Sequence, residues 1–366
     1  MHLQHLAALG PLLYSFGVAA AADEHFDVLN FVDPLIGTTD GGHVFPGASM
    51  PYGMAKPVAD VIDERQGGFS TNDSPITGFS HMHDSGTGGG ASLGNFPLFP
   101  QTGCPGDDLY KCNWNKHDRA TNRINGTAEA RPGYFAVTLN TSIHAEMTAA
   151  NHTALYRFTF PKGLKSREAR AAADGSSYKP VILADLTDLA DSRGAGNMTV
   201  DPKTGRLTGS GVFRPSFGIG TYRLHFCADF KGAKVIDTGV WMNNRPGSDP
   251  KTVNIPDDQS SPPLPAGAWV QFEAPGTNQI LARVGMSYKS VDQACRSAEK
   301  EIPNFDFRAT RYQAEDAWRE KLNVVKVNNK GISSDLQKTF WSGIYRSLIS
   351  PQDYTGQYFL LRATRL

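Results

Sequence analysis

A block of short, alternating segments between residues 133 and 289 most limits the folds open to this chain. Residues 156–160 read Tyr-Arg-Phe-Thr-Phe, and residues 222–226 read Tyr-Arg-Leu-His-Phe, so apolar and polar side chains alternate. This period of two predicts antiparallel strands with one face on a core and one face in water. So many strands in succession predict a large antiparallel β-sandwich. We expect strands at residues 134–139, 143–149, 154–160, 180–186, 207–213, 220–230, 235–242, 268–272 and 279–288, and an exposed loop at 245–267.

The pattern changes to helices after the last of these strands. Ser290 and Gln293 form a capping box, a signal that opens a helix, and Ser334 is expected to cap a later one. We expect helices at residues 290–302, 306–322 and 334–349, and a short strand at 323–327. The last helix carries a broad apolar stripe of Phe340, Trp341, Ile344, Tyr345 and Leu348. Because such a stripe normally packs on further helices, we expect a C-terminal helical domain that is only begun here.

The chain before the strand block is rich in glycine and proline, which favours functional loops on a few short strands. A short strand is expected at residues 31–37. Two of the loops combine glycine with histidine, namely Asp-Gly-Gly-His-Val-Phe-Pro-Gly at 40–47 and Gly-Phe-Ser-His-Met-His-Asp-Ser-Gly-Thr-Gly-Gly-Gly at 78–90. So many glycines indicate positive φ angles or a close approach of the backbone to another group. We interpret the two loops as parts of one site.

The second loop contains residues that could serve several chemistries. His81, His83 and Asp84 could hold a metal ion, but a catalytic zinc needs three protein ligands, and the sequence shows no convincing third one. Asp84-Ser85-Gly86-Thr87 matches the active-site loop of aspartic proteases, yet that mechanism needs a second such loop, which the sequence lacks. A phosphate-binding Gly-Lys-Ser/Thr is not present either. We therefore favour hydrogen bonding to a polar ligand.

The N-terminus is typical of an exported protein. Residues 1–22 read as a secretory signal, with an apolar core at 6–20 and four alanines at 19–22. An anchor helix is the alternative, although the core is shorter than the roughly 20 residues of a membrane span. No other segment is long and apolar enough to cross a membrane. Five candidate N-glycosylation acceptors, Asn72, Asn125, Asn140, Asn151 and Asn197, also fit secretion.

The four cysteines have no zinc-type or redox-type spacing, and in an oxidising compartment they would form disulfides. Cys104 and Cys112 are the natural short-loop pair, which leaves Cys227 and Cys295 for the second bridge. Four cysteines allow three connectivities, so the other two pairings stay open.

The charge balance excludes several partners. The chain has 36 Lys and Arg residues against 36 Asp and Glu residues, without a Lys/Arg-rich run. A positive field for nucleic acid is therefore absent, and a neutral ligand fits better. Trp114, Trp241 and Trp269 could stack on sugar rings, and packing in the core is the alternative for each.

Several long motifs resemble family 92 glycoside hydrolases. Phe-Val-Asp-Pro-Leu-Ile-Gly-Thr at 31–38, Gly-Gly-His-Val-Phe-Pro-Gly-Ala at 41–48 and Pro-Tyr-Gly-Met at 51–54 resemble the opening of these enzymes. The loop at 78–88 resembles their next block in its fungal form. Residues 339–346 and 350–354 resemble the first helix of their catalytic domain and the segment after it. The resemblance extends from about residue 31 to residue 356.

The resemblance implies a calcium-dependent, inverting exo-α-mannosidase that trims mannose from N-glycans and related mannosides. It also implies an N-terminal β-sandwich, a helical linker and an (α/α)6 barrel, with the active site between sandwich and barrel. The two glycine–histidine loops match those that the sandwich contributes to the mannose subsite, where Phe45 would pack on the terminal sugar. The expected sugar contacts are His43, Phe45, His83, Asp84, Gly88 and Gly89.

On this basis we divide the chain into a signal peptide (1–22), a β-sandwich (23–289), a helical linker (290–330) and the truncated start of the barrel (331–366). The general acid, the general base and the calcium ligands of the family are expected beyond residue 366. We therefore assign no catalytic or metal-binding residue within the chain and expect the chain alone to be inactive on mannosides. The alternative function is a stand-alone carbohydrate-binding β-sandwich module.

Overall fold

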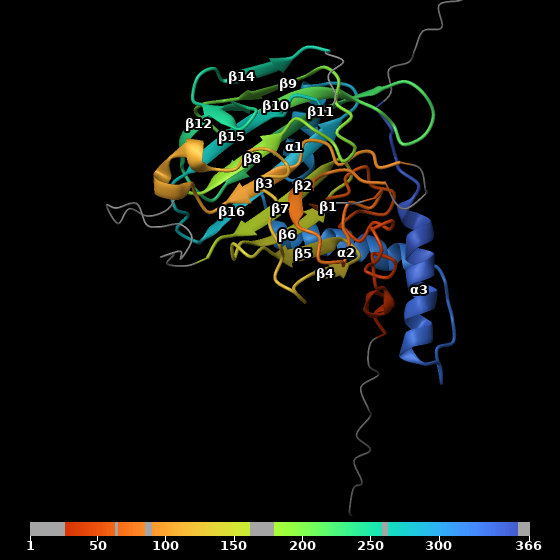
Figure 1. The fold of residues 1–366 in the computed structure, drawn as a ribbon. Helices are drawn as coiled ribbons and strands as arrows, with labels where there is room; N and C mark the ends of the chain where they lie inside the picture. The colour runs from red at the N-terminus through yellow and green to blue at the C-terminus, as the bar shows by residue number, and fades with distance from the viewer. Residues whose placement is uncertain (1–25, 63–64, 85–89, 162–178, 258–262, 358–366) are drawn as a thin grey trace, which may run out of the picture.

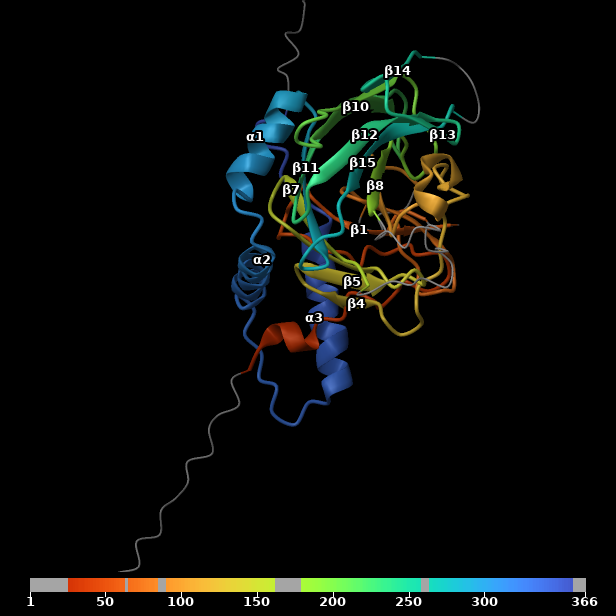
Figure 2. The same ribbon diagram turned by 90° about the vertical axis from the view of Figure 1, so that its left-hand side faces the viewer.

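The computed structural model describes residues 26–62, 65–84, 90–161, 179–257 and 263–357. Two antiparallel sheets pack face to face, and helices α1 and α2 cover the outer side of one of them (Figures 1 and 2). Most of the buried apolar side chains form one cluster that draws on both sheets. The β-sandwich followed by helices that the sequence predicts is therefore confirmed. The signal-peptide region lies outside the described residues.

The first sheet has seven strands in the order β1, β2, β3, β8, β15, β12 and β13. In that order they are Val58–Val61, Ile76–Ser80, Leu98–Gln101, Val181–Asp185, Ala266–Phe272, Val235–Met242 and Arg245–Gly247. All neighbouring pairs are antiparallel. Because β2 ends at Ser80, the sheet places the histidine pair of the second glycine–histidine loop directly at a strand end.

The second sheet has nine strands in the order β14, β9, β10, β11, β16, β7, β6, β5 and β4. In that order they are Thr252–Ile255, Gly196–Val200, Leu207–Phe213, Tyr222–Lys231, Gln279–Ser287, Thr153–Thr159, His144–Ala149, Tyr134–Thr138 and Glu129–Arg131. The alternation seen in the sequence sets which face is buried. In β9, for example, Met198 and Val200 are buried, whereas Asn197 and Thr199 between them are partly exposed.

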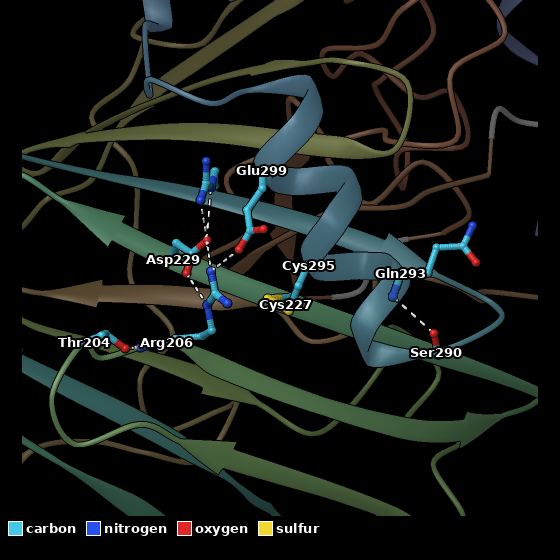
Figure 3. The surroundings of a disulfide bond; sticks show 9 residues. Thr204, Arg206, Cys227, Asp229, Ser290, Gln293, Cys295 and Glu299 are labelled. Atoms are coloured by element: carbon cyan, nitrogen blue, oxygen red, sulfur yellow. Dashed lines mark hydrogen bonds and ion pairs between the residues drawn. A yellow bond between two sulfur atoms is a disulfide. The ribbon is translucent and has the colours of Figure 1, made fainter.

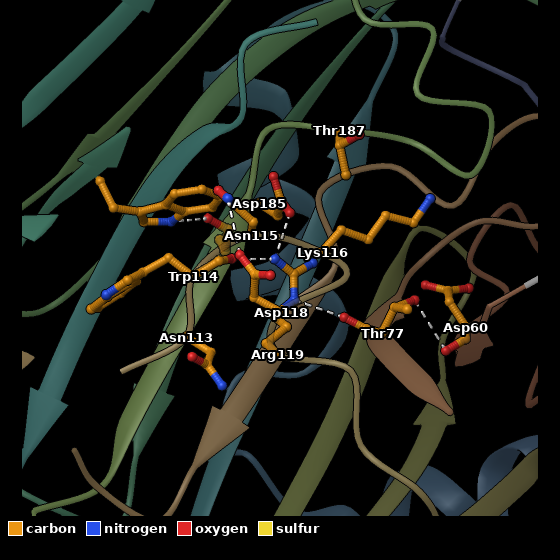
Figure 4. Close-up of polar contacts among 12 residues, drawn as sticks. Asp60, Thr77, Asn113, Trp114, Asn115, Lys116, Asp118, Arg119, Asp185 and Thr187 are labelled. Atoms are coloured by element: carbon orange, nitrogen blue, oxygen red, sulfur yellow. Dashed lines mark hydrogen bonds and ion pairs between the residues drawn. The ribbon is translucent and has the colours of Figure 1, made fainter. Parts of the chain in front are cut away.

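A loop with two short 3-10 turns, Pro105–Asp107 and Leu109–Lys111, covers the outer face of the seven-stranded sheet. Under it Trp114, Trp241 and Trp269 are fully buried and pack on one another, with ring centroids about 6 Å apart. These tryptophans therefore belong to the core, and the hypothesis that they stack on sugars is wrong. The same loop carries Arg119, whose guanidinium is buried against Asp185 at the end of β8 (Figure 4).

Helix α1 (Val291–Glu301) lies along β11 and β16 of the nine-stranded sheet. Gly285 on β16 permits this approach, because a Cβ at that position would lie 2.1 Å from the carbonyl oxygen of Ala294. The Cys227–Cys295 disulfide fastens the helix to β11 (Figure 3). The second disulfide joins Cys104 to Cys112, so the connectivity is the one that the sequence analysis favoured.

Helix α2 (Phe307–Leu322) packs on β5, β6 and β7, and α3 (Ser334–Ile349) packs on a 3-10 turn at Val28–Phe31 and on α2. The rings of Trp318 and Tyr345 join the last two helices at 4.4 Å. In the predicted apolar stripe of α3, Trp341 and Tyr345 are buried, whereas 43% of Phe340 is exposed. None of the described helices combines the length and apolar character that crossing a bilayer requires.

Some predicted elements are wrong. Residues 31–37 form turns instead of a strand, because the carboxylate of Asp33 accepts a hydrogen bond from the Leu35 amide and Pro34 lacks a donor for a ladder. Residues 323–327 are not a strand, and Val324 is 75% exposed. The 245–267 segment contains the short edge strands β13 and β14, although its proline and aspartate content predicts a loop. The cap of α3 is Ser333, one residue before the predicted one.

Candidate functional site

The two glycine–histidine loops meet, as the sequence predicts. Phe45 from the first loop stacks on His83 from the second, with ring centroids 5.6 Å apart and an angle of 24° between the rings. Gly42 lies so close to the backbone of Phe69 that a Cβ would approach its carbonyl oxygen to 2.3 Å. Its φ of +67° also favours glycine. Gly42 thus allows the first loop to pack tightly on the backbone at Phe69.

His83 is held from both ring nitrogens. Its Nδ1 lies 2.7 Å from the carbonyl oxygen of Lys56, and its Nε2 lies 2.6 Å from Asp60 Oδ1. The Ser80 hydroxyl donates to the other oxygen of Asp60 at 2.6 Å and also lies 3.1 Å from His83 Nε2. The cluster is not a Ser-His-Asp catalytic triad, because in such a triad the serine and the carboxylate use opposite nitrogens of the histidine.

Burial changes the role that we assign to two expected sugar contacts. Phe45 is 1% exposed and His83 is fully buried, so neither has surface to offer a sugar. The expectation that these side chains touch the ligand is therefore corrected, since the stacked pair supports the loop that carries Asp84. His43, by contrast, is exposed, with Nδ1 3.1 Å from Gln66 Oε1. Two other expected contacts, Gly88 and Gly89, lie outside the described residues.

His81 is also a buried structural residue. Its Nδ1 lies 2.6 Å from the Tyr156 hydroxyl, and its Nε2 lies 3.0 Å from the carbonyl oxygen of Phe96. Burial lowers the pKa of His81 to about 3, so the ring is neutral at physiological pH. Within the described ranges, His, Cys, Asp and Glu side chains do not form a group of three or more that could hold a metal ion.

A cavity of about 380 Å³ opens beside Asp84. This volume falls in the range of about 300–1,000 Å³ that is typical of small-molecule sites. One oxygen of the Asp84 carboxylate, Oδ2, accepts hydrogen bonds from Ser92 at 2.8 Å and from Ser216 at 3.2 Å. The other oxygen accepts none from the residues that the structure describes, so it remains available to a ligand. The cavity is lined by Asp84, Ser92, Leu93, Pro215, Ser216, Phe217, Tyr222, Tyr288, Tyr354 and Gln357.

Aromatic rings make up much of the cavity wall. Tyr288 packs edge-on against Tyr222 at 6.0 Å and against Tyr354 at 5.5 Å. Burial is the main cause that raises the pKa of Tyr222 and Tyr288, so both hydroxyls stay protonated. Sequence reasoning missed these rings, although Tyr222 begins β11 and Tyr288 follows the end of β16, and the two strands pair.

A buried lysine binds the end of helix α3. Lys56 is 1% exposed, and its ammonium donates to the carbonyl oxygen of Ile349, the last residue of α3, at 2.8 Å. Burial lowers the pKa of Lys56 to about 7, while the negative charge of Asp84 acts in the opposite direction. A residue of the sandwich thus caps the end of a helix beyond it.

The substitution Lys56→Met is expected to remove part of the rise of stability with pH. The folded-state pKa of about 7 lies below the ordinary value of 10.5, so between these values the unfolded chain binds a proton that the folded chain lacks. Stability therefore rises with pH across this window, and the gain is lost as pH falls from 10.5 towards 7. Urea unfolding at pH 7 and pH 9 is expected to show about 2 kcal/mol less of this rise in the variant. An unchanged pH dependence, equal to that of the exposed-lysine control Lys330→Met, would contradict this account.

A β-sandwich whose strand ends and helical extension enclose an aromatic cavity with a carboxylate is suited to binding a small polar ligand such as a sugar. The profile of the glycosyl hydrolase family 92 N-terminal domain matches residues 31–287, and that of the family 92 catalytic domain matches residues 293–364. The chain belongs to glycosyl hydrolase family 92.

Individual relatives agree with this assignment. A protein of Arthroderma benhamiae described as an uncharacterized secreted glycosidase is 50% identical over 95% of this chain and 45% of its own length. The family 92 glycosyl hydrolase ccman5 superposes with a TM-score of 0.74 at 22% identity, over 90% of this chain and 42% of that one. A family 92 α-mannosidase of Bacteroides thetaiotaomicron gives a TM-score of 0.71 at 23% identity, over 89% and 42%. The chain thus spans less than half of the length of each relative.

Proposed function

We propose that this chain is exported and supplies the sugar-binding sandwich of an α-mannosidase that acts on N-glycan-type mannosides. The cavity beside Asp84 carries this proposal, because it combines aromatic walls with a carboxylate of which one oxygen accepts no hydrogen bond from the described residues. The substrate class is supported by the α-mannosidase of Bacteroides thetaiotaomicron, of which a second structure holds mannoimidazole.

Each part of the cavity would recognise a different part of the sugar. The rings of Tyr222, Tyr288 and Phe217 offer apolar faces, which suit the C–H side of a pyranose. Asp84 offers a charged acceptor, and hydrogen bonds from sugar hydroxyls to a carboxylate are stronger than those to neutral groups. Ser92 and Ser216 fix the orientation of that carboxylate.

Hydrolysis with inversion requires two carboxylates that lie about 6.5–9.5 Å apart on either side of the scissile bond. Among the residues that line the cavity, Asp84 is the one carboxylate. The buried carboxylate of Asp60 is already bound to Ser80 and His83. We therefore propose that the general acid and the general base come from outside the described residues.

The same argument applies to calcium. The family resemblance implies this ion, but the described side chains do not bring together a ligand group that fits it. We assign no step to a metal in this part of the chain. We propose that the calcium implied by the resemblance would be held by residues outside those described.

The test is calorimetry of the 366-residue chain with α-linked dimannosides, together with an assay for released mannose. We expect binding without turnover, unaffected by a chelator. Asp84→Ala is expected to weaken binding about tenfold, because a hydrogen bond to a charged group contributes about 1.5–3 kcal/mol. The matched control Asp292→Ala removes an exposed carboxylate on α1 and should leave binding unchanged. Equal affinity of the Asp84 variant and the parent would refute the site, and chelator-sensitive mannose release would refute the inactivity.

A stand-alone carbohydrate-binding module is the second candidate, since the same cavity would serve it. The two functions differ in their dependence on further residues. A module binds oligosaccharides with full affinity by itself, whereas the sandwich of an enzyme should bind more tightly once the rest of the catalytic domain is joined to it. Comparing the affinity of this chain with that of a fusion to the catalytic domain of the Arthroderma benhamiae relative separates the two.

A further inference from the structure

A second cavity lies at the far end of the β5–β6 hairpin and has no part in the site beside Asp84. Its volume is about 420 Å³. It is lined by Asp73, Ser74, Asn122, Arg123, Ile124, Asn125 and Asn140. Except for Ile124, which is 41% exposed, every lining side chain is polar. Such a wall offers hydrogen-bond donors, hydrogen-bond acceptors and one apolar contact, which together suit a hydroxylated ring more than an apolar ligand.

Arg123 makes this cavity rigid. Its guanidinium donates to the carbonyl oxygens of Ser70 at 3.2 Å and Thr71 at 2.6 Å, and it also donates to Asn72. The guanidinium also lies over the ring of Phe69 at 5.2 Å. One side chain therefore ties the 70–74 loop to the 121–125 segment, and the space between them is a built feature of the fold.

Three of the five Asn-x-Ser/Thr triplets gather around this cavity. Asn125 and Asn140 line it, and Asn72 precedes the lining residue Asp73. All three asparagines are exposed. The turn after Asn125 is fixed by Thr127, whose hydroxyl donates to the carbonyl oxygen of Ile124 at 2.6 Å. The backbone N–H of Asn140 donates a hydrogen bond to the backbone carbonyl oxygen of Asn122 at 2.8 Å.

The remaining triplets are placed differently. Asn151 is exposed in the turn between β6 and β7 and does not line the cavity. Asn197 lies within β9, where its side-chain amide donates to Ser210 on the neighbouring strand at 3.3 Å. Only the cavity group therefore combines an exposed acceptor asparagine with a concave polar surface beside it.

We propose that this cavity holds the first two sugars of an N-linked glycan of the protein itself, attached at Asn125 or at Asn140. Attachment joins the asparagine Nδ2 to C1 of a sugar delivered by a lipid-linked glycosyl diphosphate. The amide loses one proton, and the lipid diphosphate leaves. The N-acetylglucosamine core then fills the space between the two loops. This inference rests on the proposed export of the chain, but not on the proposed activity towards mannosides.

The test uses the full chain secreted by a host that glycosylates, and a commercial endoglycosidase that cuts between the two core sugars. Site occupancy and release are followed by mass spectrometry of glycopeptides. Under native conditions, the glycan in the cavity is expected to be released about tenfold more slowly than the glycan on Asn151, because two or so hydrogen bonds must break first. After denaturation, both should be released equally fast.

Variants identify which asparagine carries the slowly released glycan and test whether the cavity holds it. Asn125→Gln and Asn140→Gln remove one candidate each, and the slow release should vanish in only one of them. Asn122→Trp fills the cavity without changing the sequence of any Asn-x-Ser/Thr triplet, and it should restore rapid release. The proposal is overturned if the glycans on Asn125, Asn140 and Asn151 are released at the same native rate, or if neither Asn125 nor Asn140 carries a glycan.

Discussion

Replacing both Cys227 and Cys295 by serine is expected to lower the free energy of unfolding by about 4 kcal/mol. The bridge joins residues that are 68 positions apart, so it removes much of the loop-closure entropy of the unfolded chain. It also holds α1 on β11 beside an ion-pair network, in which Asp229 contacts Arg206 at 2.6 Å (Figure 3). Asp229 also contacts Arg283 at 2.8 Å. Denaturant unfolding measured by circular dichroism tests this value.

The matched control is the Cys104→Ser and Cys112→Ser pair, because that bridge spans only eight positions. Its loss is expected to cost about 2 kcal/mol less, since the entropy term grows with the logarithm of loop length. Equal losses for the two bridges would contradict the chain-entropy account. They would show that the Cys227–Cys295 bridge contributes no more than a local link.

Arg119→Met is expected to lower the free energy of unfolding by about 3–5 kcal/mol. The guanidinium donates to Asp185 at 2.6 Å, to the carbonyl oxygen of Trp114 at 2.7 Å and to that of Thr77 at 2.8 Å (Figure 4). Asp185 is almost fully buried, so removing Arg119 leaves a carboxylate without a countercharge. Such a breakage costs more than the ion pair itself contributes.

The pH dependence identifies this mechanism. Burial already raises the pKa of Asp185, and Arg119 opposes the rise, so the variant should raise that pKa further. A raised folded-state pKa of a carboxyl means that the folded state binds the proton more tightly, so the variant should recover stability as pH falls.

Adding Asp185→Leu to Arg119→Met should restore part of the loss. The control Lys111→Met breaks an exposed pair with Asp108 at 3.6 Å and should cost less than about 1 kcal/mol. A pH-independent loss in Arg119→Met would contradict the argument.

The sheet framework was predictable because its signal is local. The alternation in Tyr222–Lys231 and Thr153–Thr159 predicts strands without knowledge of the strands that pair with them. The start of a helix is predicted by a capping residue such as Ser290. The short edge strands β13 and β14 give too few residues for a period to show. Residues 31–37 resembled a strand in composition, but a local side-chain bond to the backbone decided their conformation.

The site was less predictable because it depends on contacts distant in sequence. Asp84 could be singled out from its loop alone. Its neighbours Ser216 and Tyr354 come from a hairpin tip and from beyond α3, so the cavity wall could not be read locally. The glycine–histidine motifs of their loops predict that His83 and Phe45 contact a ligand. Whether a side chain contacts a ligand or supports the site depends on its burial, and burial is a tertiary property.

The lysine that caps α3 has a consequence for how ligand binding in the cavity and docking of the segment after α3 are related. Lys56 anchors the end of α3, and Tyr354 and Gln357, a few residues further on, form part of the cavity wall. Gln357 also accepts a hydrogen bond from Ser287 at the end of β16 at 2.9 Å. Detachment of this segment would open the cavity, so the two equilibria are linked. By reciprocity, the factor by which docking of the segment tightens binding of a ligand in the cavity equals the factor by which that ligand tightens docking.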